Sequence, residues 1–328
     1  MDVFWYALVG LLLAGYLALE SVDFGVGMLL PLADTETGRA RMRRGVVPLF
    51  LANEVWLVAF AGLLFGALPL LEGELLSALR IPVVLLLTAW FLRDAALWFR
   101  TAHPGDRWRR AWDVVLPVSS LVLAAGWGAV LAALTRGLST HGNGHAVATA
   151  GDLLHPFALL GAAVAVVGSL RQGSLFAGRG LPADTSLAVR LGRLDRVLTP
   201  VLLVLLAVTA AVGATVTDAP VAVAVVAVLA AAVVYGSGRL RAAGRTTAAL
   251  VLGAAPLIAL PVLVGAANGT TVLATRSGDG VLHLSRAIAD SASLGLLTVT
   301  VLPFLIAVVL GQVWIWRVFG RADHHRTA

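Results

Sequence analysis

The chain has 328 residues, of which 59% are hydrophobic and only 13% are charged. Because about a quarter of the residues are charged in soluble globular domains, this composition excludes a soluble enzyme or binding module and indicates an all-α polytopic membrane protein. The chain contains no cysteine, which excludes disulfide bonds, thiolate metal ligands and cysteine nucleophiles.

Nine apolar runs are each long enough to cross about 30 Å of hydrocarbon as a helix. In chain order they cover residues 4–32, 46–71, 80–99, 113–135, 153–172, 197–217, 219–236, 247–267 and 291–316. The connections between them are too short to form further domains. We therefore expect nine transmembrane helices and a single integral membrane domain over residues 1–328.

The arginines predict the orientation of these helices. All 24 cationic residues are arginine, and 20 of them lie in alternate connections, at 33–45, 93–112, 171–196 and 237–246 and from 317 onward. Because cytoplasmic connections carry an excess of positive charge, the N-terminus is expected outside and the C-terminus in the cytoplasm. The net charge of +6 is then a topology signal, and no nucleic-acid partner is expected.

Polar and charged side chains occur at membrane depth in the first three runs. At a rise of about 1.5 Å per residue they fall in one layer of the cytoplasmic half. The candidates are Glu20, Asp23, Asn53, Glu54, Arg93 and Asp94. Since one arginine cannot neutralise four acids, some of the carboxyl groups must be protonated or hydrated. The layer indicates a hydrated proton pathway or a polar interface with a partner, and the alternative is an arginine–carboxylate pair that only fixes helix register.

Ligands for a metal or haem are scarce at membrane depth. Six of the seven histidines lie in loops or in the tail, and His155 lies at the outer mouth of the fifth run. Buried haem or copper needs His, Met or Cys ligands. We therefore expect no catalytic residue, metal or cofactor bound by this chain alone.

Several stretches of the chain resemble subunit II of the cytochrome bd-type quinol oxidases. ESVDFGVGML (20–29) and NEVWL (53–57) resemble the motifs of the first two helices, and the segment from FLR to RWRRAWD (91–113) resembles the end of the third helix and the loop after it. LLHPFALLGA (153–162) and PFLIAVVLGQVWIWRVF (303–319) resemble the fifth and the last helix. Besides the polar candidates above, the matching positions include Gly25, Gly27, Trp56, Arg100 and Asp113, which we interpret as structural; the two glycines permit close helix approach or a local break.

The resemblance implies a haem-free subunit of the bacterial cytoplasmic membrane, built from two four-helix bundles and one peripheral helix. Its partner would be subunit I, which carries haems b and d and the quinol oxidation site. The subunit described here would support assembly and proton supply to the oxygen-reducing subunit. A structural quinone and a small single-span subunit are further components that the resemblance allows.

The chain departs from the family pattern at two acidic positions. Leu51 stands where the family has an aspartate, and Trp98 stands where the family often has an acid. Any proton path in this subunit is then expected to use Glu54 with Asp23, or subunit I supplies the protons alone. Two other functions stay open, a secondary transporter with a broken helix at 25–27 and a diverged scaffold subunit without an oxidase role.

Overall fold

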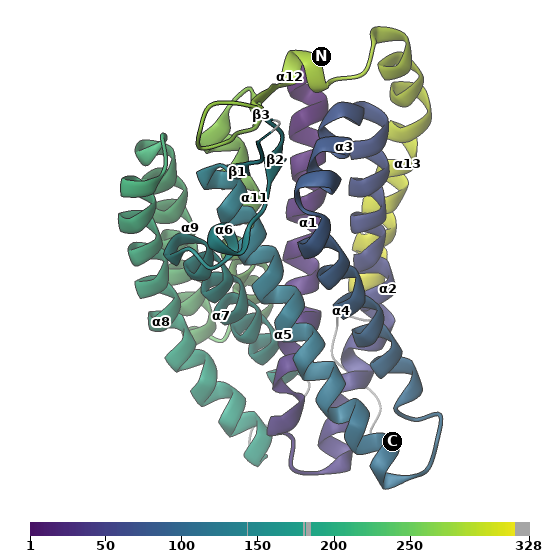
Figure 1. Ribbon diagram of the computed structural model, residues 1–328. Helices are drawn as coiled ribbons and strands as arrows, with labels where there is room; N and C mark the ends of the chain where they lie inside the picture. Colours follow the sequence, from purple (N-terminus) through teal and green to yellow (C-terminus); the bar gives the residue numbers. More distant parts are fainter. Residues whose placement is uncertain (143, 180, 182–184, 319–328) are drawn as a thin grey trace.

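The computed structural model describes residues 1–142, 144–179, 181 and 185–318 (Figure 1). Nine helices in this part of the chain are long and apolar enough to cross a membrane, which confirms the predicted number. The candidate spans are Asp2–Leu32, Glu36–Ala67, Arg80–Phe99, Asp106–Arg136, Pro156–Gly178, Ser186–Val216, Pro220–Ala242, Thr246–Asn268 and Ser291–Val318. The tail from residue 319, which was predicted to be cytoplasmic, lies outside the described residues.

The elements follow one another with short connections. The helices are α1 (Asp2–Leu29), the 3-10 turn η1 (Leu30–Leu32), α2 (Glu36–Ala67), α3 (Pro69–Ala78), α4 (Arg80–Phe99), α5 (Asp106–Arg136), α6 (Ala150–Leu153), α7 (Pro156–Gly178), α8 (Ser186–Val216), α9 (Pro220–Ala242), α10 (Thr246–Gly253), α11 (Ala255–Asn268), α12 (Leu284–Ala287) and α13 (Ser291–Val318). The strands are β1 (Ser139–Thr140), β2 (Ala146–Val147), β3 (Thr271–Leu273) and β4 (Leu282–His283).

Some helices extend beyond the apolar runs that predicted them. α2 begins at Glu36 instead of residue 46, and α8 begins at Ser186 instead of residue 197. The added residues include several arginines, which favour helix and reach the polar boundary with their long side chains. α2 ends at Ala67 and the chain turns into α3 at Pro69, so residues 68–71 do not continue the second span. The eighth span consists of α10 and α11, with Pro256 in the first turn of α11.

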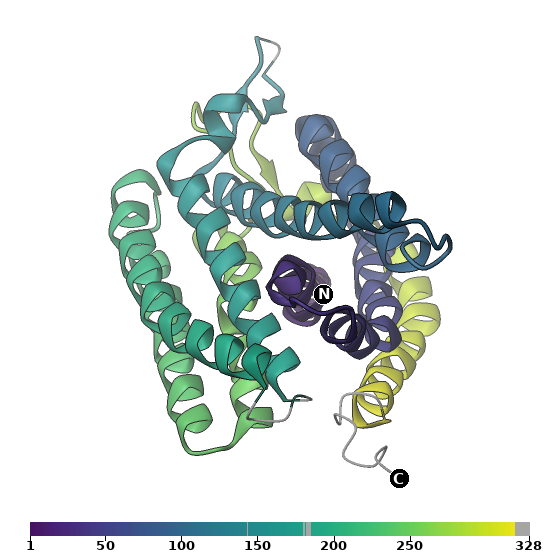
Figure 2. The same cartoon turned by 90° about the horizontal axis from the view of Figure 1, so that it is seen from below.

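α1 is the central helix of the molecule. It packs against α2, α5, α7 and α11, and Figure 2 shows it surrounded by the other helices when the molecule is seen from below. α4 packs on α5, α8 lies between α7 and α9, and α13 packs along α2. Side chains near the end of α1 are therefore enclosed by several helices.

Glycines allow the closest helix contacts. A Cβ atom on Gly25 of α1 would lie 1.9 Å from the carbonyl oxygen of Ser169 and 2.6 Å from the backbone nitrogen of Gly173, both on α7. Gly128 of α5 and Gly161 of α7 form a similar contact. Gly27 faces α5, where a Cβ would lie only 2.1 Å from the Ser120 hydroxyl oxygen. α1 continues through Gly25 and Gly27 to Leu29, so the sequence GVG marks close approach and not a helix break.

Short elements cover the end of the molecule at which α1 begins (Figure 1). β1 pairs antiparallel with β2, and β3 with β4. Asp152 is 1% exposed there; it accepts hydrogen bonds from Thr149 and Ser139 and pairs with Arg276 at 2.8 Å. Burial raises the pKa of Asp152, but these hydrogen bonds and the arginine charge outweigh burial and hold the pKa below its usual range.

Candidate functional site

Arg93 of α4 is the centre of a buried group of charged side chains. Its guanidinium donates through Nη1 to Glu20 of α1 and through Nη2 to Glu54 of α2. It also donates from Nε and Nη2 to Asp94 Oδ1, at 3.1 and 3.0 Å. The side chains of Arg93 and Glu20 are 1% and 0% exposed. We call Glu20, Asp23, Glu54, Arg93 and Asp94 the charged cluster; three helices that were predicted to place these residues in one layer bring them together.

Aromatic side chains complete the surroundings of Arg93. The guanidinium carbon lies 5.6 Å from the centre of the Phe24 ring, a cation–π geometry. Trp90, one turn before Arg93 on α4, donates its indole N–H to Glu54 Oε1 at 2.7 Å. Trp90 thus helps to hold the carboxylate that Arg93 binds.

Asp23 belongs to a chain of hydrogen bonds with a fixed direction. Trp56 Nε1 can only donate, and it donates to Gln312 Oε1 of α13 at 3.2 Å. Gln312 therefore presents its Nε2 to Asn53 Oδ1, at 2.8 Å, and Asn53 in turn donates from Nδ2 to Asp23 Oδ2, also at 2.8 Å. The indole thus determines the orientation of two amides and makes Asp23 Oδ2 an acceptor. Gln312 was not among the predicted site residues, and its signal in the sequence was a lone amide in an apolar run.

The cluster contains more acid than base. Among the described residues it holds four carboxyl groups and one arginine, and the carboxylate oxygens Glu20 Oε1 and Asp23 Oδ1 are buried without a hydrogen-bond partner. An ionised carboxylate without partners is costly in a region of low dielectric constant. Part of the cluster must therefore bind protons or water.

Arg100 organises a second ionic group at the end of α4. It donates from Nη1 and Nη2 to both oxygens of Glu36, at 2.7 and 2.8 Å, and from Nε to Asp113 at the start of α5. Arg39 and Arg43 of α2 lie beside it, each 3.5 Å from a carboxylate of the group. Arg100 and Asp113 thus join three helix ends, as a structural role requires.

The two positions that depart from the family pattern lie on the outside of the molecule. The side chains of Leu51 and Trp98 are 56% and 54% exposed. They are on neighbouring helices, and the Trp98 ring contacts Phe50 with a centroid distance of 6.0 Å. An acid at either position would face outward, and the buried charged cluster is complete without it.

Another buried ionic group lies between α7, α8 and α9, and the sequence analysis did not single it out. Arg171 is fully buried; it lies 3.4 Å from Asp195 Oδ1 and donates to Thr199 and Ser237, each at 2.9 Å. Arg241 pairs with the other oxygen of Asp195, also at 2.9 Å. These arginines were counted as loop charges, because each stands near the end of an apolar run.

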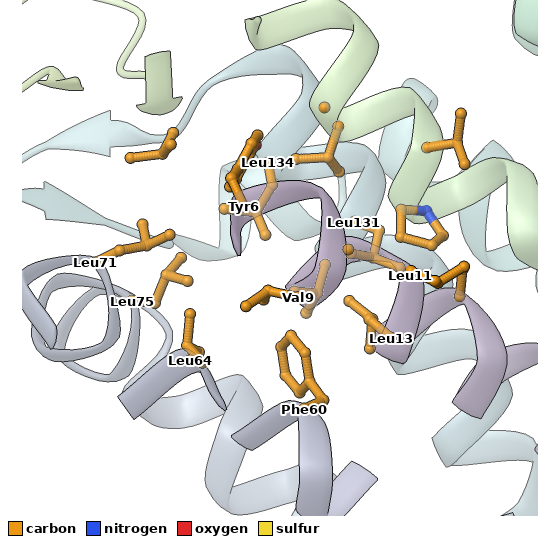
Figure 3. Close-up of a pocket in the computed structure, with 18 of the residues that line it drawn as sticks. Tyr6, Val9, Leu11, Leu13, Phe60, Leu64, Leu71, Leu75, Leu131 and Leu134 are labelled. Carbon is orange, nitrogen blue, oxygen red and sulfur yellow. The ribbon is translucent and has the colours of Figure 1, made fainter. Parts of the chain in front are cut away.

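A large apolar cavity lies at the opposite end of α1 from the charged cluster. Its volume is about 780 Å³. Figure 3 shows leucine side chains of α3 and α5 and the ring of Phe60 around α1, with Tyr6 at its edge. The lining also includes Trp127 of α5 and residues of α11. The size is that of a ligand pocket, and the lining suits an apolar molecule.

Metal ligands do not gather anywhere in the part of the chain that the structure describes: no group of three or more His, Cys, Asp or Glu side chains is arranged to hold an ion. His155 precedes α7, and its Nδ1 accepts a hydrogen bond from the backbone N–H of Phe157 at 3.2 Å. This histidine caps a helix.

The fold and the charged cluster define a class, the polytopic helical membrane proteins with ionic groups buried between their helices. Within that class the family is shown by sequence. The family model described as cytochrome bd terminal oxidase subunit II matches residues 1–319, and the chain belongs to this family.

Individual relatives agree with this assignment. The chain is 32% identical over 173 residues to cytochrome bd ubiquinol oxidase subunit 2 of Bacillus subtilis (strain 168), which covers 52% of this chain and 51% of the relative. It is 30% identical over 177 residues to cytochrome bd-I ubiquinol oxidase subunit 2 of Escherichia coli (strain K12), covering 52% and 47%. The chain thus spans about half the length of the curated relatives it matches.

A solved structure shares the fold along nearly the whole chain. It is the bd oxidase from Geobacillus thermodenitrificans, with a TM-score of 0.75 and 16% sequence identity, covering 97% of this chain and 98% of the other. At this identity the comparison shows the fold alone.

Proposed function

We propose that this protein is the haem-free subunit II of a cytochrome bd-type quinol:oxygen oxidoreductase of the respiratory chain, and that it handles protons for the oxygen-reducing subunit I. Family membership over residues 1–319 supports the oxidase role. The observation that carries the proton-handling role is the charged cluster, in which three carboxyl groups pair with one buried arginine and a fourth, Asp23, is bound by Asn53. Such a cluster can take up and release protons while Arg93 keeps it in place.

The proposed topology follows from the arginines. We place the N-terminus outside and the C-terminus in the cytoplasm of a bacterial cytoplasmic membrane, with residues 1–328 as one integral membrane domain. Helix packing favours two four-helix bundles: α1, α2, α4 and α5 form the first, and α7, α8, α9 and the α10–α11 pair form the second. α13 is then the peripheral helix, since it packs along α2.

Within the cluster, Asp23 and Glu54 are the acids that we assign to proton transfer. Glu54 is held by Trp90 and Arg93, and Asp23 is held on one oxygen by Asn53. Both carboxyl groups approach Arg93 from neighbouring helices, so a proton taken up by one lowers the net negative charge that the other feels. Glu20 stays bound to Arg93 and keeps α1 in register with α4.

The outer face of α2 and α4 is where we place subunit I. Leu51 and Trp98 lie on this face, and both are more than half exposed. Because Leu51 and Trp98 stand where the family has acids, the proposed interface carries less charge in this protein. Protons then cross the interface at another place, or the partner supplies them at these two positions. A small single-span subunit is a further partner that we expect in the complex.

Haems b and d are assigned to subunit I in this proposal, and a structural quinone is assigned to the apolar cavity of this chain. The cavity fits the long apolar tail of a quinone by its volume of about 780 Å³ and by its leucine-rich lining. Tyr6 and Trp127 are the groups in the lining that could hold the polar ring. The chemistry that a quinone supplies, transfer of electrons and protons, is not required of this site.

The transporter alternative receives no support at the place where it was expected. Binding sites of secondary transporters are built on broken helices, whereas α1 is continuous through Gly25 and Gly27. The scaffold alternative, a subunit without an oxidase role, differs from our proposal in the behaviour of the acids, and the following experiment separates the two.

The test uses the complex purified with its partner subunit. Oxygen-reduction turnover and proton uptake are measured for Asp23→Asn and Glu54→Gln, with Asp34→Asn as the control. Asp34 pairs with Arg190 at the surface of the same end of the molecule. We expect proton uptake to slow by about tenfold or more in both cluster variants and to stay at the wild-type rate in the control. Wild-type rates for both cluster variants in an intact complex would refute the proton-handling role, and isolation of the chain as a homomer without haem would refute the oxidase role.

A further inference from the structure

A small cavity lies beside the charged cluster, toward the N-terminal end of α2. Its volume is about 10 Å³. Four helices contribute to its lining, which includes Asp23, Arg43, Arg93, Val46, Leu97 and Leu116. A buried water molecule needs a cavity of about 10–15 Å³, measured for the centre of a water-sized probe, and two or more polar partners. The cavity therefore has the size of a site for one water molecule.

Asp23 and Arg43 line this cavity, and each has a buried polar atom without a hydrogen-bond partner among the described residues. Their residues are 3% and 8% exposed. Within the described part of the chain, Asp23 Oδ1 and Arg43 Nε have no hydrogen-bond partner. Oδ1 is an acceptor when the carboxylate is ionised, whereas Nε–H is a donor only. A water molecule between them can accept from Arg43 and donate to Asp23, which satisfies both atoms.

The chain of hydrogen bonds from Trp56 determines which oxygen of Asp23 takes a proton. Asn53 donates to Oδ2 at 2.8 Å, and its amide cannot turn around because Gln312 donates to its oxygen. A proton on Oδ2 would weaken this bond, because a hydroxyl oxygen is a poorer acceptor than a carboxylate oxygen, whereas a proton on Oδ1 leaves the bond in place. A proton on Asp23 therefore resides on Oδ1, the unpaired oxygen of a residue that lines the cavity.

We propose that a single water molecule bound between Arg43 Nε and Asp23 Oδ1 delivers protons to Asp23. The inference rests on the proposed function and adds the place where protons enter the cluster. The water accepts a proton from the cytoplasmic side while one of its own O–H protons passes to Oδ1, so the products are a neutral carboxyl group and a water molecule. Arg43 keeps its proton throughout and orients the water.

The entrance lies at the ionic group of the helix ends. Arg43 Nη2 is 3.5 Å from Glu36 Oε1, and the Glu36 side chain is 54% exposed. Leu51 does not line the cavity; it faces outward from α2, at 56% exposure. Protons can thus reach Asp23 without the aspartate that the family carries at the position of Leu51.

Two variants of the purified complex test the water site. Arg43→Gln removes the Nε donor, and Val46→Met fills the cavity while Arg43 stays in place. Arg44→Gln is the matched control, because Arg44 is the next residue, carries the same charge and is exposed. Infrared difference spectra in normal and ¹⁸O-labelled water, recorded with and without reduction, detect the O–H vibration of a bound water, and proton uptake is followed in the same samples.

We expect the isotope-sensitive water band to disappear in both cavity variants and proton uptake to slow by about tenfold, while Arg44→Gln behaves as wild type. Wild-type proton uptake in assembled complexes of both cavity variants would overturn the inference. If Asp23→Asn still slows proton uptake in that case, the proposed function stands and only the entrance is wrong. If Asp23→Asn and Glu54→Gln also have no effect, the proposed function fails together with the inference.

Discussion

The contact between α1 and α7 at Gly25 predicts that two glycine-to-alanine substitutions change the stability of the protein in opposite directions: Gly25→Ala destabilises it and Gly236→Ala stabilises it. In Gly25→Ala the new Cβ would lie 1.9 Å from the carbonyl oxygen of Ser169. Carbon–oxygen contacts in proteins are about 3.3–3.6 Å long, so the two helix backbones must separate by roughly 1.5 Å. Overpacking costs about 1–3 kcal/mol. We expect the upper part of this range, because the opposing atoms belong to the backbone and cannot turn away as a side chain could.

Gly236→Ala is the control for helix propensity. Gly236 lies within α9, and a Cβ there would meet no described atom within 4 Å. Alanine in place of glycine within a helix stabilises by about 0.5–1 kcal/mol, and this variant should show that gain alone. Equilibrium unfolding of the purified complex in mixed detergent–SDS micelles measures both values. Shifts of the same sign and size in the two variants would refute the close-contact reasoning.

Two further predictions concern buried acids outside the cluster. The pKa of Asp152 is below its usual range in the folded protein, so its stabilising contribution is complete above the unfolded pKa of about 3.9 and is lost as the pH falls through the lower folded value. Asp152→Asn should lower the unfolding midpoint at neutral pH and remove part of the loss of stability that begins below about pH 5. A parallel pH dependence in both proteins would contradict this. Asp195→Asn should lower the free energy of unfolding by about 3–5 kcal/mol, because Arg171 is left buried without its counter-charge. Arg241→Gln should lower it by only about 1 kcal/mol, since Arg241 is partly exposed. Equal losses for the two variants in SDS unfolding would argue against the burial of the Arg171–Asp195 pair.

The sequence was sufficient to predict the helices and the common level of three charged side chains. Helix rise is constant, so counting residues from the arginine-rich ends placed Glu20, Glu54 and Arg93 at one level, and the structure brings them into contact. The predicted ends of the helices were less accurate. Polar residues extend helices past the hydrocarbon, as at Glu36 of α2, and hydrophobicity does not record this extension.

Helix rotation and long-range pairing could not be predicted in this way. Leu51 looked like the loss of a buried acid, but its outward direction depends on how α2 is turned against α1. Asn53 and Gln312 are 259 residues apart, and nothing local in either segment indicates their contact. Arg171 was assigned to a loop by the charge rule that predicted the orientation, because that rule does not distinguish an arginine in water from one that has a buried partner.

The attachment of α13 has a consequence for the order in which the protein matures. α13 follows the other eight described spans in the chain and so leaves the ribosome after them; it packs along α2, and only 11% of its most apolar stretch is buried. Until it inserts, Gln312 is missing, and Trp56 has no amide through which to orient Asn53. The first eight spans can then fold around Asp23 while the amide beside it is free to turn. The hydrogen bonds of the charged site are therefore complete only after α13 has been synthesised and inserted, so a late span determines how the amide that binds Asp23 of α1 is oriented.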